Sequence, residues 1–138
     1  MRDKVIFGPA GKPIEFNGKA HESPEFLGPL GLYAFEYQST YGVRIGESSA
    51  LKLRESAEEN GVLMSMHCPY YVNVCSKEEE KIESTIDRLV QSAKVGEFMG
   101  AYRLVFHPGF YSGRKPETCM DLAKKLIQNF LKDVMRKE

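Results

Sequence analysis

Hydrophobic and polar residues follow two different periods along the chain. Short apolar runs that end in glycine or proline indicate strands, whereas longer segments with an apolar residue every three or four positions indicate helices. Each predicted strand precedes a predicted helix, which favours a parallel sheet joined by right-handed crossovers. The predicted strands cover 5–7, 32–37, 62–66 and 102–106, and the predicted helices cover 22–27, 47–60, 76–100 and 116–134.

Residues at the helix ends support these boundaries. Gly61 is well placed just past the second helix, because glycine readily adopts the left-handed conformation that ends helices. Ser76 and Glu79 have the spacing of a capping box at the start of the third helix. Pro116 suits the first turn of the fourth. The pattern therefore predicts an α/β protein built from four β/α units.

Four such units amount to half of a TIM (β/α)8 barrel, which typically needs about 250 residues. The 138 residues have room for one domain, and their 42% hydrophobic and 28% charged content is typical of a globular protein with a core. We therefore expect one domain, 1–138, that forms a half-barrel with parallel strands and stops before a fifth strand.

Charge and cysteine content narrow the function classes. Nineteen basic and nineteen acidic residues give a net charge of zero, which excludes a globally basic nucleic-acid binder but allows local basic loops. The three cysteines include no CxxC pair, which favours free thiols in a reducing compartment. The N-terminus lacks the apolar core of a signal peptide, and no stretch approaches the roughly 18 apolar residues of a membrane span. These features predict a cytoplasmic protein without a membrane partner.

Polar residues gather at the C-terminal ends of the predicted strands. Strand phase places Glu36, His67 and His107 on one face, opposite an apolar face that helices would cover. Active sites of parallel α/β folds lie at this end of the sheet. If the two histidine strands are neighbours, both imidazoles can converge on one zinc ion; the alternative is that each histidine is a hydrogen-bonded structural group. Glu36 is a candidate ligand or a partner orienting an imidazole, unless it bonds a loop or faces solvent.

Two segments around these histidines resemble a known family. Residues 66–73, Met-His-Cys-Pro-Tyr-Tyr-Val-Asn, and residues 105–109, Val-Phe-His-Pro-Gly, are similar to motifs of the endonuclease IV family of zinc-dependent apurinic/apyrimidinic (AP) endonucleases, most of all its archaeal branch, and of the wider xylose isomerase-like barrels. The resemblance implies that His67 and His107 are zinc ligands and that Tyr70 enters the DNA minor groove near the abasic site. Other DNA-facing positions that it implies are Asn73, Gly11 in a first loop, and Gln38 and Arg44 in a second loop whose residues match poorly.

The resemblance also implies a reaction and its partners. The family cleaves the phosphodiester bond 5′ to an abasic site in double-stranded DNA with metal-activated hydroxide. It holds up to three zinc ions, with manganese as an alternative metal. Its remaining ligands come from the second half of the barrel, beginning with a glutamate that would fall just after Glu138. We therefore expect this chain to be inactive alone and to pair with a missing C-terminal half or with a second copy of itself.

Two other functions are consistent with the same residues. A sugar isomerase or epimerase of the same barrel superfamily also uses strand-end histidines and carboxylates around a metal, and Glu36 would fit that use. The second alternative is a non-catalytic half-barrel that assembles with a partner chain. An open parallel sheet leaves two unpaired edges, which proteins normally cover.

Overall fold

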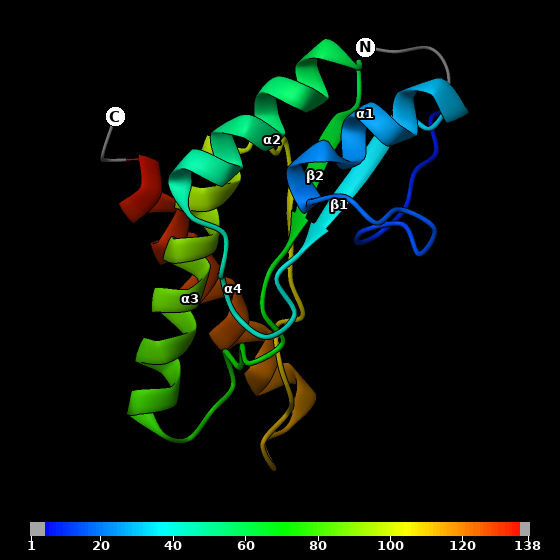
Figure 1. Ribbon diagram of the computed structural model, residues 1–138. Helices are drawn as coiled ribbons and strands as arrows, with labels where there is room; N and C mark the ends of the chain where they lie inside the picture. The colour runs from blue at the N-terminus through cyan, green and yellow to red at the C-terminus, as the bar shows by residue number, and fades with distance from the viewer. Residues whose placement is uncertain (1–4, 136–138) are drawn as a thin grey trace.

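The computed structural model describes residues 5–135, in which helices and strands alternate along the chain (Figure 1). Two 3-10 turns, η1 (Ala20–Glu22) and η2 (Gly28–Leu30), flank the first helix. The strands are β1 (Ala34–Gln38), β2 (Leu63–His67) and β3 (Leu104–Val105), and the helices are α1 (Ser23–Leu27), α2 (Glu47–Glu59), α3 (Glu79–Phe98) and α4 (Pro116–Met135).

The strands form one parallel sheet in the order β1-β2-β3. In its register, Gln38 at the end of β1 lies opposite His67 at the end of β2. His67 lies in turn opposite Val105, the last residue of β3. The C-terminal ends of the strands are therefore level, and His107 lies two residues beyond this edge.

The predicted strand at 5–7 is wrong, because residues 7–11 instead form an irregular segment parallel to β1. Amides of β1 donate hydrogen bonds to the carbonyls of Phe7 and Pro9, at 3.1 Å each, and one bridge joins residue 10 to β1. Pro9 has no N–H to donate, so the ladder cannot be regular there. Gly8 approaches β1 so closely that a Cβ at this position would overlap the neighbouring backbone.

Two other boundaries differ from the prediction. The regular part of β3 has two residues in place of the expected 102–106, although the N–H of Tyr102 still donates to the Met64 carbonyl at 3.0 Å. Helix α3 begins at Glu79, so the predicted capping box does not form. The hydroxyl of Ser76 instead accepts a hydrogen bond from the N–H of Glu78 at 3.1 Å, which closes a turn before the helix.

The remaining helices follow the prediction closely. The predicted helix at 22–27 is α1 with its adjoining 3-10 turn, and α2 and α4 begin at the predicted residues. Gly61, with φ +63°, follows α2 as expected for a residue just past a helix end. None of the helices within residues 5–135 has the length and hydropathy needed to cross a membrane.

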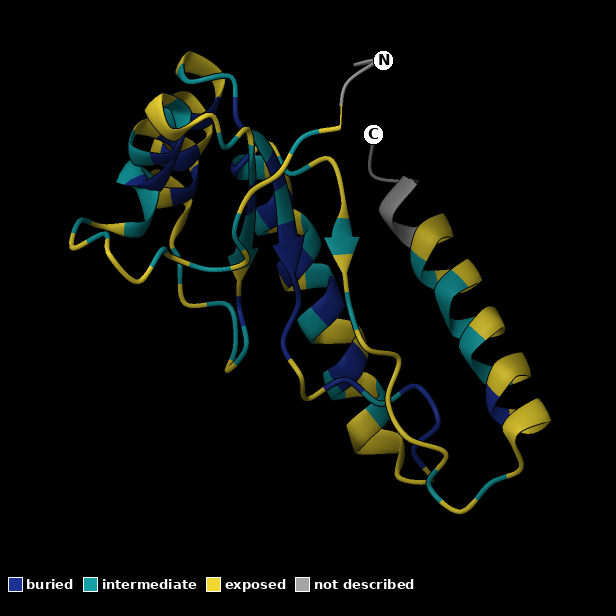
Figure 2. Ribbon diagram, turned by 90° about the vertical axis from the view of Figure 1, so that its right-hand side faces the viewer, coloured by how far each residue is buried: buried dark blue, intermediate teal, exposed yellow. Residues whose placement is uncertain are grey.

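The apolar face of the sheet packs beneath α2 and α3, as the strand phase predicts. Phe35, Met64 and Met66 are buried there with Leu53 of α2. A second buried cluster lies in the loop after β2 and reaches Cys119 of α4. Figure 2 shows α4 as mostly exposed or intermediate, with a buried residue near its start. The opposite, more polar face of the sheet leads to the edge where the histidines lie.

Candidate metal centre

His67 ends β2, and its imidazole is held by the backbone. The residue is 9% exposed, and its Nδ1 lies 2.8 Å from the carbonyl oxygen of Cys68. A carbonyl can only accept a hydrogen bond, so Nδ1 carries the proton and the neutral ring has its lone pair on Nε2. Histidines that bind metals are commonly oriented by such a bond. His67 is therefore arranged to offer Nε2 to a ligand.

His107 follows β3 and meets His67 at the end of the sheet. The centroids of the two imidazoles are 5.2 Å apart, with the ring planes at 45°. The ring of Tyr70, in the loop after β2, has its centroid 5.4 Å from each imidazole, and this residue is 50% exposed. The structure therefore brings both predicted histidines and the predicted DNA-facing tyrosine into one site. Metal binding by the histidines stays a prediction.

The two imidazoles suit zinc chemically but form an incomplete set of ligands. Zinc in proteins usually takes four ligands, of which nitrogen from histidine is among the commonest. Within residues 5–135, no three or more His, Cys, Asp and Glu side chains gather where they could hold a metal ion. A zinc ion bound by these two histidines would therefore need further ligands beyond this pair.

Glu36 is hydrogen-bonded on the neighbouring strand. Its Oε2 accepts a hydrogen bond from the hydroxyl of Ser65, 3.4 Å away, and the two residues lie opposite each other in the register. This pair lies two residues before His67, which places Glu36 about 6–7 Å back along the strand. The structure does not bring it into a three-ligand group with the two histidines. A role for Glu36 as a ligand or as the partner of an imidazole stays a prediction.

The other predicted DNA-facing residues lie around the same edge. Gln38 is opposite His67 in the register, on the exposed end of β1. Gly11 is beside it, since a Cβ at Gly11 would lie 3.6 Å from the Gln38 Cγ, and its φ of +83° favours glycine. Arg44 is in the loop between β1 and α2. DNA contacts by these residues stay predictions.

Asn73 is extensively hydrogen-bonded within the protein. Its backbone N–H donates to the hydroxyl of Thr85 at 3.0 Å. Its Oδ1 accepts hydrogen bonds from the N–H groups of Cys75 at 3.1 Å and Phe110 at 3.3 Å, and its Nδ2 donates to the hydroxyl of Ser112 at 3.0 Å. The side chain has little hydrogen-bonding capacity left for DNA. A DNA contact by Asn73 stays a prediction.

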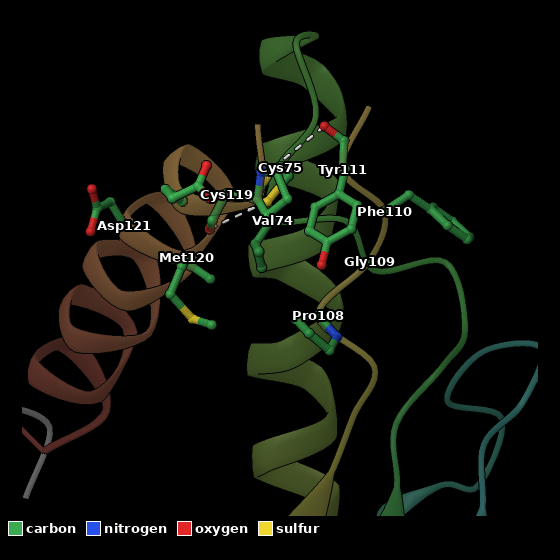
Figure 3. A pocket seen from close by; sticks show the side chains of 12 residues that line it. Val74, Cys75, Pro108, Gly109, Phe110, Tyr111, Cys119, Met120 and Asp121 are labelled. Carbon is green, nitrogen blue, oxygen red and sulfur yellow. Dashed lines mark hydrogen bonds between the residues drawn. The ribbon is translucent and has the colours of Figure 1, made fainter. Parts of the chain in front are cut away.

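A pair of thiols beside the site has no signal in the sequence. Cys75 and Cys119 meet where α4 begins: the Cys75 thiol donates to the Cys119 carbonyl at 3.5 Å, and the Cys119 thiol donates to the Tyr111 carbonyl at 3.4 Å (Figure 3). Both line a largely apolar pocket of about 580 Å³. Burial, together with the adjacent Cys119 thiol, raises the pKa of Cys75 to about 11. All three cysteines are free, as predicted.

A family model described as the xylose isomerase-like TIM barrel matches residues 27–136. The chain belongs to this family. Its parallel strands, open sheet and four helices within residues 5–135 form a fragment of such a barrel, so the predicted α/β fold class is confirmed. His67 and His107 lie at the C-terminal ends of β2 and β3, which is the end of the strands where TIM barrels have their active sites.

A sequence relative and several solved structures are similar to this chain. An uncharacterized protein of Methanocaldococcus jannaschii is 39% identical over 127 residues, which are 92% of this chain and 45% of that protein. Endonuclease IV from Thermus thermophilus has a TM-score of 0.67 and 20% identity, covering 91% of this chain and 47% of its own.

Two further structures share the fold at lower identity. SacUVDE has a TM-score of 0.64 and 19% identity, covering 79% of this chain and 42% of its own. D-psicose 3-epimerase, solved with D-fructose, has a TM-score of 0.59 and 15% identity, covering 80% of this chain and 45% of its own. The chain therefore spans less than half the length of each of these relatives, and the three structures demonstrate a shared fold.

Proposed function

We propose that this chain carries part of the zinc site of an AP endonuclease, which cleaves the phosphodiester bond 5′ to an abasic site in double-stranded DNA. The observation that carries the proposal is the meeting of His67, His107 and Tyr70 at one end of the sheet, with ring centroids 5.2–5.4 Å apart. The similarity of the fold to endonuclease IV from Thermus thermophilus supports it.

In this proposal each side chain has a separate task. His67 and His107 would hold the metal, and the bond from Nδ1 of His67 to the Cys68 carbonyl fixes the orientation of that imidazole. Zinc bound there would supply a Lewis acid for phosphodiester hydrolysis, and manganese is the alternative metal. Tyr70 offers a half-exposed ring beside both imidazoles, where it can stack on a base or enter a groove at the lesion.

The remaining ligands would come from a second polypeptide segment, either a C-terminal half of the barrel or another copy of this chain. β3 pairs with β2 alone among the described strands, and Val105 at its end is 41% exposed. Another strand can therefore pair there and bring further side chains to the histidine rim. Sedimentation of a zinc-loaded sample tests whether copies associate; a monomer at micromolar concentration contradicts completion of the site by a second copy.

Binding of abasic DNA tests the proposal without requiring a complete active site. We would measure anisotropy of a labelled duplex containing a tetrahydrofuran abasic site, beside the same duplex undamaged. Tyr70→Ala should weaken binding of the abasic duplex about fivefold or more, the loss expected for one stacking ring. The matched control is Tyr102→Ala, because Tyr102 is 54% exposed but precedes β3, at the other end of the sheet. Equal affinity for both duplexes, or equal effects of the two variants, would contradict the proposal.

A sugar isomerase or epimerase is the second candidate. The similarity in fold to D-psicose 3-epimerase and the place of Glu36 on the histidine face favour it. Saturable binding of a ketose that depends on His67 and Glu36, without affinity for abasic DNA, would favour the isomerase or epimerase and contradict the nuclease proposal. If neither ligand binds while copies associate, the chain is a non-catalytic half-barrel.

A further inference from the structure

One histidine adjoins each of the loops that follow β2 and β3, and the side chain of Asn73 links the two loops by hydrogen bonds. Asn73 lies six residues after His67 in the first loop. Its Oδ1 accepts a hydrogen bond from the N–H of Phe110, 3.3 Å away, and its Nδ2 donates to the hydroxyl of Ser112 at 3.0 Å. Both partners belong to the loop that contains His107. The same Oδ1 also accepts from the N–H of Cys75, which fixes the side chain within its own loop.

Backbone contacts place this junction directly beside His107. The N–H of Val74 donates to the carbonyl of Pro108, the residue after His107, at 2.9 Å. Gly109 packs on Asn73 so tightly that a Cβ at this position would lie 2.5 Å from the Asn73 Cα. The backbone of Gly109 also has φ +118°, a conformation that other residues rarely adopt. The backbone directly after His107 is therefore held by the residues around Asn73, whereas Val105 before it is held by the amide of Cys68.

We infer that Asn73 is a positioning residue that holds His107 against His67 and Tyr70. This inference rests on the proposed function for its metal, and it assigns Asn73 a task inside the protein in place of a DNA contact. Three hydrogen bonds of the amide are already made within the two loops. An amide used in this way fixes the distance between the imidazoles, much as outer partners of metal-binding histidines fix ring orientation.

Proton NMR of the metal-free chain tests the positioning by itself. In the wild type, nuclear Overhauser effects (NOEs) should join the ring protons of His107 to those of His67 and Tyr70. Asn73→Ala should abolish both, while the effect between His67 and Tyr70, which are three residues apart, persists. Asn73→Asp keeps the acceptor that binds Cys75 and Phe110, and its second oxygen can accept a hydrogen bond from the Ser112 hydroxyl, so it should retain the contacts. Asn17→Ala is the matched control, because Asn17 lies in the loop before η1, far along the chain from both histidines.

A zinc titration of the same variants, followed with a competing chromogenic indicator, measures the consequence. Asn73→Ala should lower zinc affinity about tenfold to a hundredfold, the range found when outer partners of metal ligands are lost, and Asn73→Asp should restore most of it. Should Asn73→Ala fail to fold, Ser112→Ala removes the Nδ2 partner alone, and the ring contacts of His107 should weaken in it.

The outcomes separate this inference from the proposed function. Unchanged ring contacts in Asn73→Ala, or weaker abasic DNA binding with those contacts intact, overturn the positioning role. Loss of the contacts in Asn73→Ala supports the positioning role even when the wild type takes up no zinc. A wild type that takes up no zinc contradicts the metal assignment alone. Absence of the ring contacts from the wild type overturns the inference as well.

Discussion

Gly109→Ala is the substitution that most directly probes the contact between the two histidine loops. An alanine Cβ there would lie 2.5 Å from both the Cα and the Oδ1 of Asn73 and 2.9 Å from its Cγ. Ordinary contacts begin near 3.4 Å, so one of the loops must move by about 0.9 Å. The φ of +118° adds backbone strain of about 1–3 kcal/mol, and the overpacking adds about 1–3 kcal/mol.

Gly42→Ala separates these two contributions. Gly42 has nearly the same φ, +120°, but apart from its chain neighbours no atom of residues 5–135 lies within 4 Å of a Cβ placed there. Urea unfolding should therefore show that backbone strain lowers the free energy of unfolding of both variants. Gly109→Ala should be less stable than Gly42→Ala by a further amount of about 1–3 kcal/mol, the cost of overpacking. Each kcal/mol should lower the Tm by about 3–5 °C. Equal stability of the two variants within about 0.5 kcal/mol would refute the tight contact with Asn73.

Two further predictions concern the core and the thiol pair. Met66→Ala should reduce the free energy of unfolding by about 2–5 kcal/mol, because Met66 is fully buried. Met120 is 71% exposed, so Met120→Ala should change that free energy by less than about 0.5 kcal/mol. Urea denaturation compares the two variants, and similar losses of stability would contradict the assigned core. The raised pKa of Cys75, about 11 against an ordinary 9.0, means that the folded protein keeps this thiol protonated when the unfolded chain does not, so stability should fall between pH 9 and pH 11. That fall should be shallower in Cys75→Ala than in Cys68→Ala, and equal slopes would count against the assignment to Cys75.

The sequence predicts those features of the fold that depend on local pattern. The alternation in β2, with Met64 and Met66 on one side and His67 on the other, reports directly which face the helices cover, because side chains alternate across a strand. Pro116 and Gly61 mark helix ends through their own backbone preferences. These features need no knowledge of distant residues.

The errors occur where a distant partner determines the local structure. Residues 7–11 follow β1 through the Phe7 and Pro9 carbonyls, and the close approach at Gly8 is invisible in the apolar pattern of 5–7. Ser76 has the spacing of a helix cap, but its hydroxyl closes a turn ahead of α3.

The candidate site divides in the same way. Strand phase and spacing bring His67 and His107 to one end of the sheet, and the register confirms that their strands are neighbours. The task of Asn73 depends on Phe110 and Ser112, which lie 37 and 39 residues away in the sequence. Likewise, Cys75 and Cys119 meet only because α4 begins beside the loop after β2. Such pairs carry no periodic signal.

A zinc titration of the wild type, His67→Ala, His107→Ala and His21→Ala tests the central claim most directly. His21 is the matched control, since it lies in η1 with its Nε2 3.9 Å from a Glu22 oxygen, away from the strand ends. We expect saturable zinc binding in the wild type and in His21→Ala, and its loss in both His67→Ala and His107→Ala. Zinc uptake that is unchanged in His67→Ala and His107→Ala, or absent from the wild type, would contradict the assignment of these histidines as metal ligands.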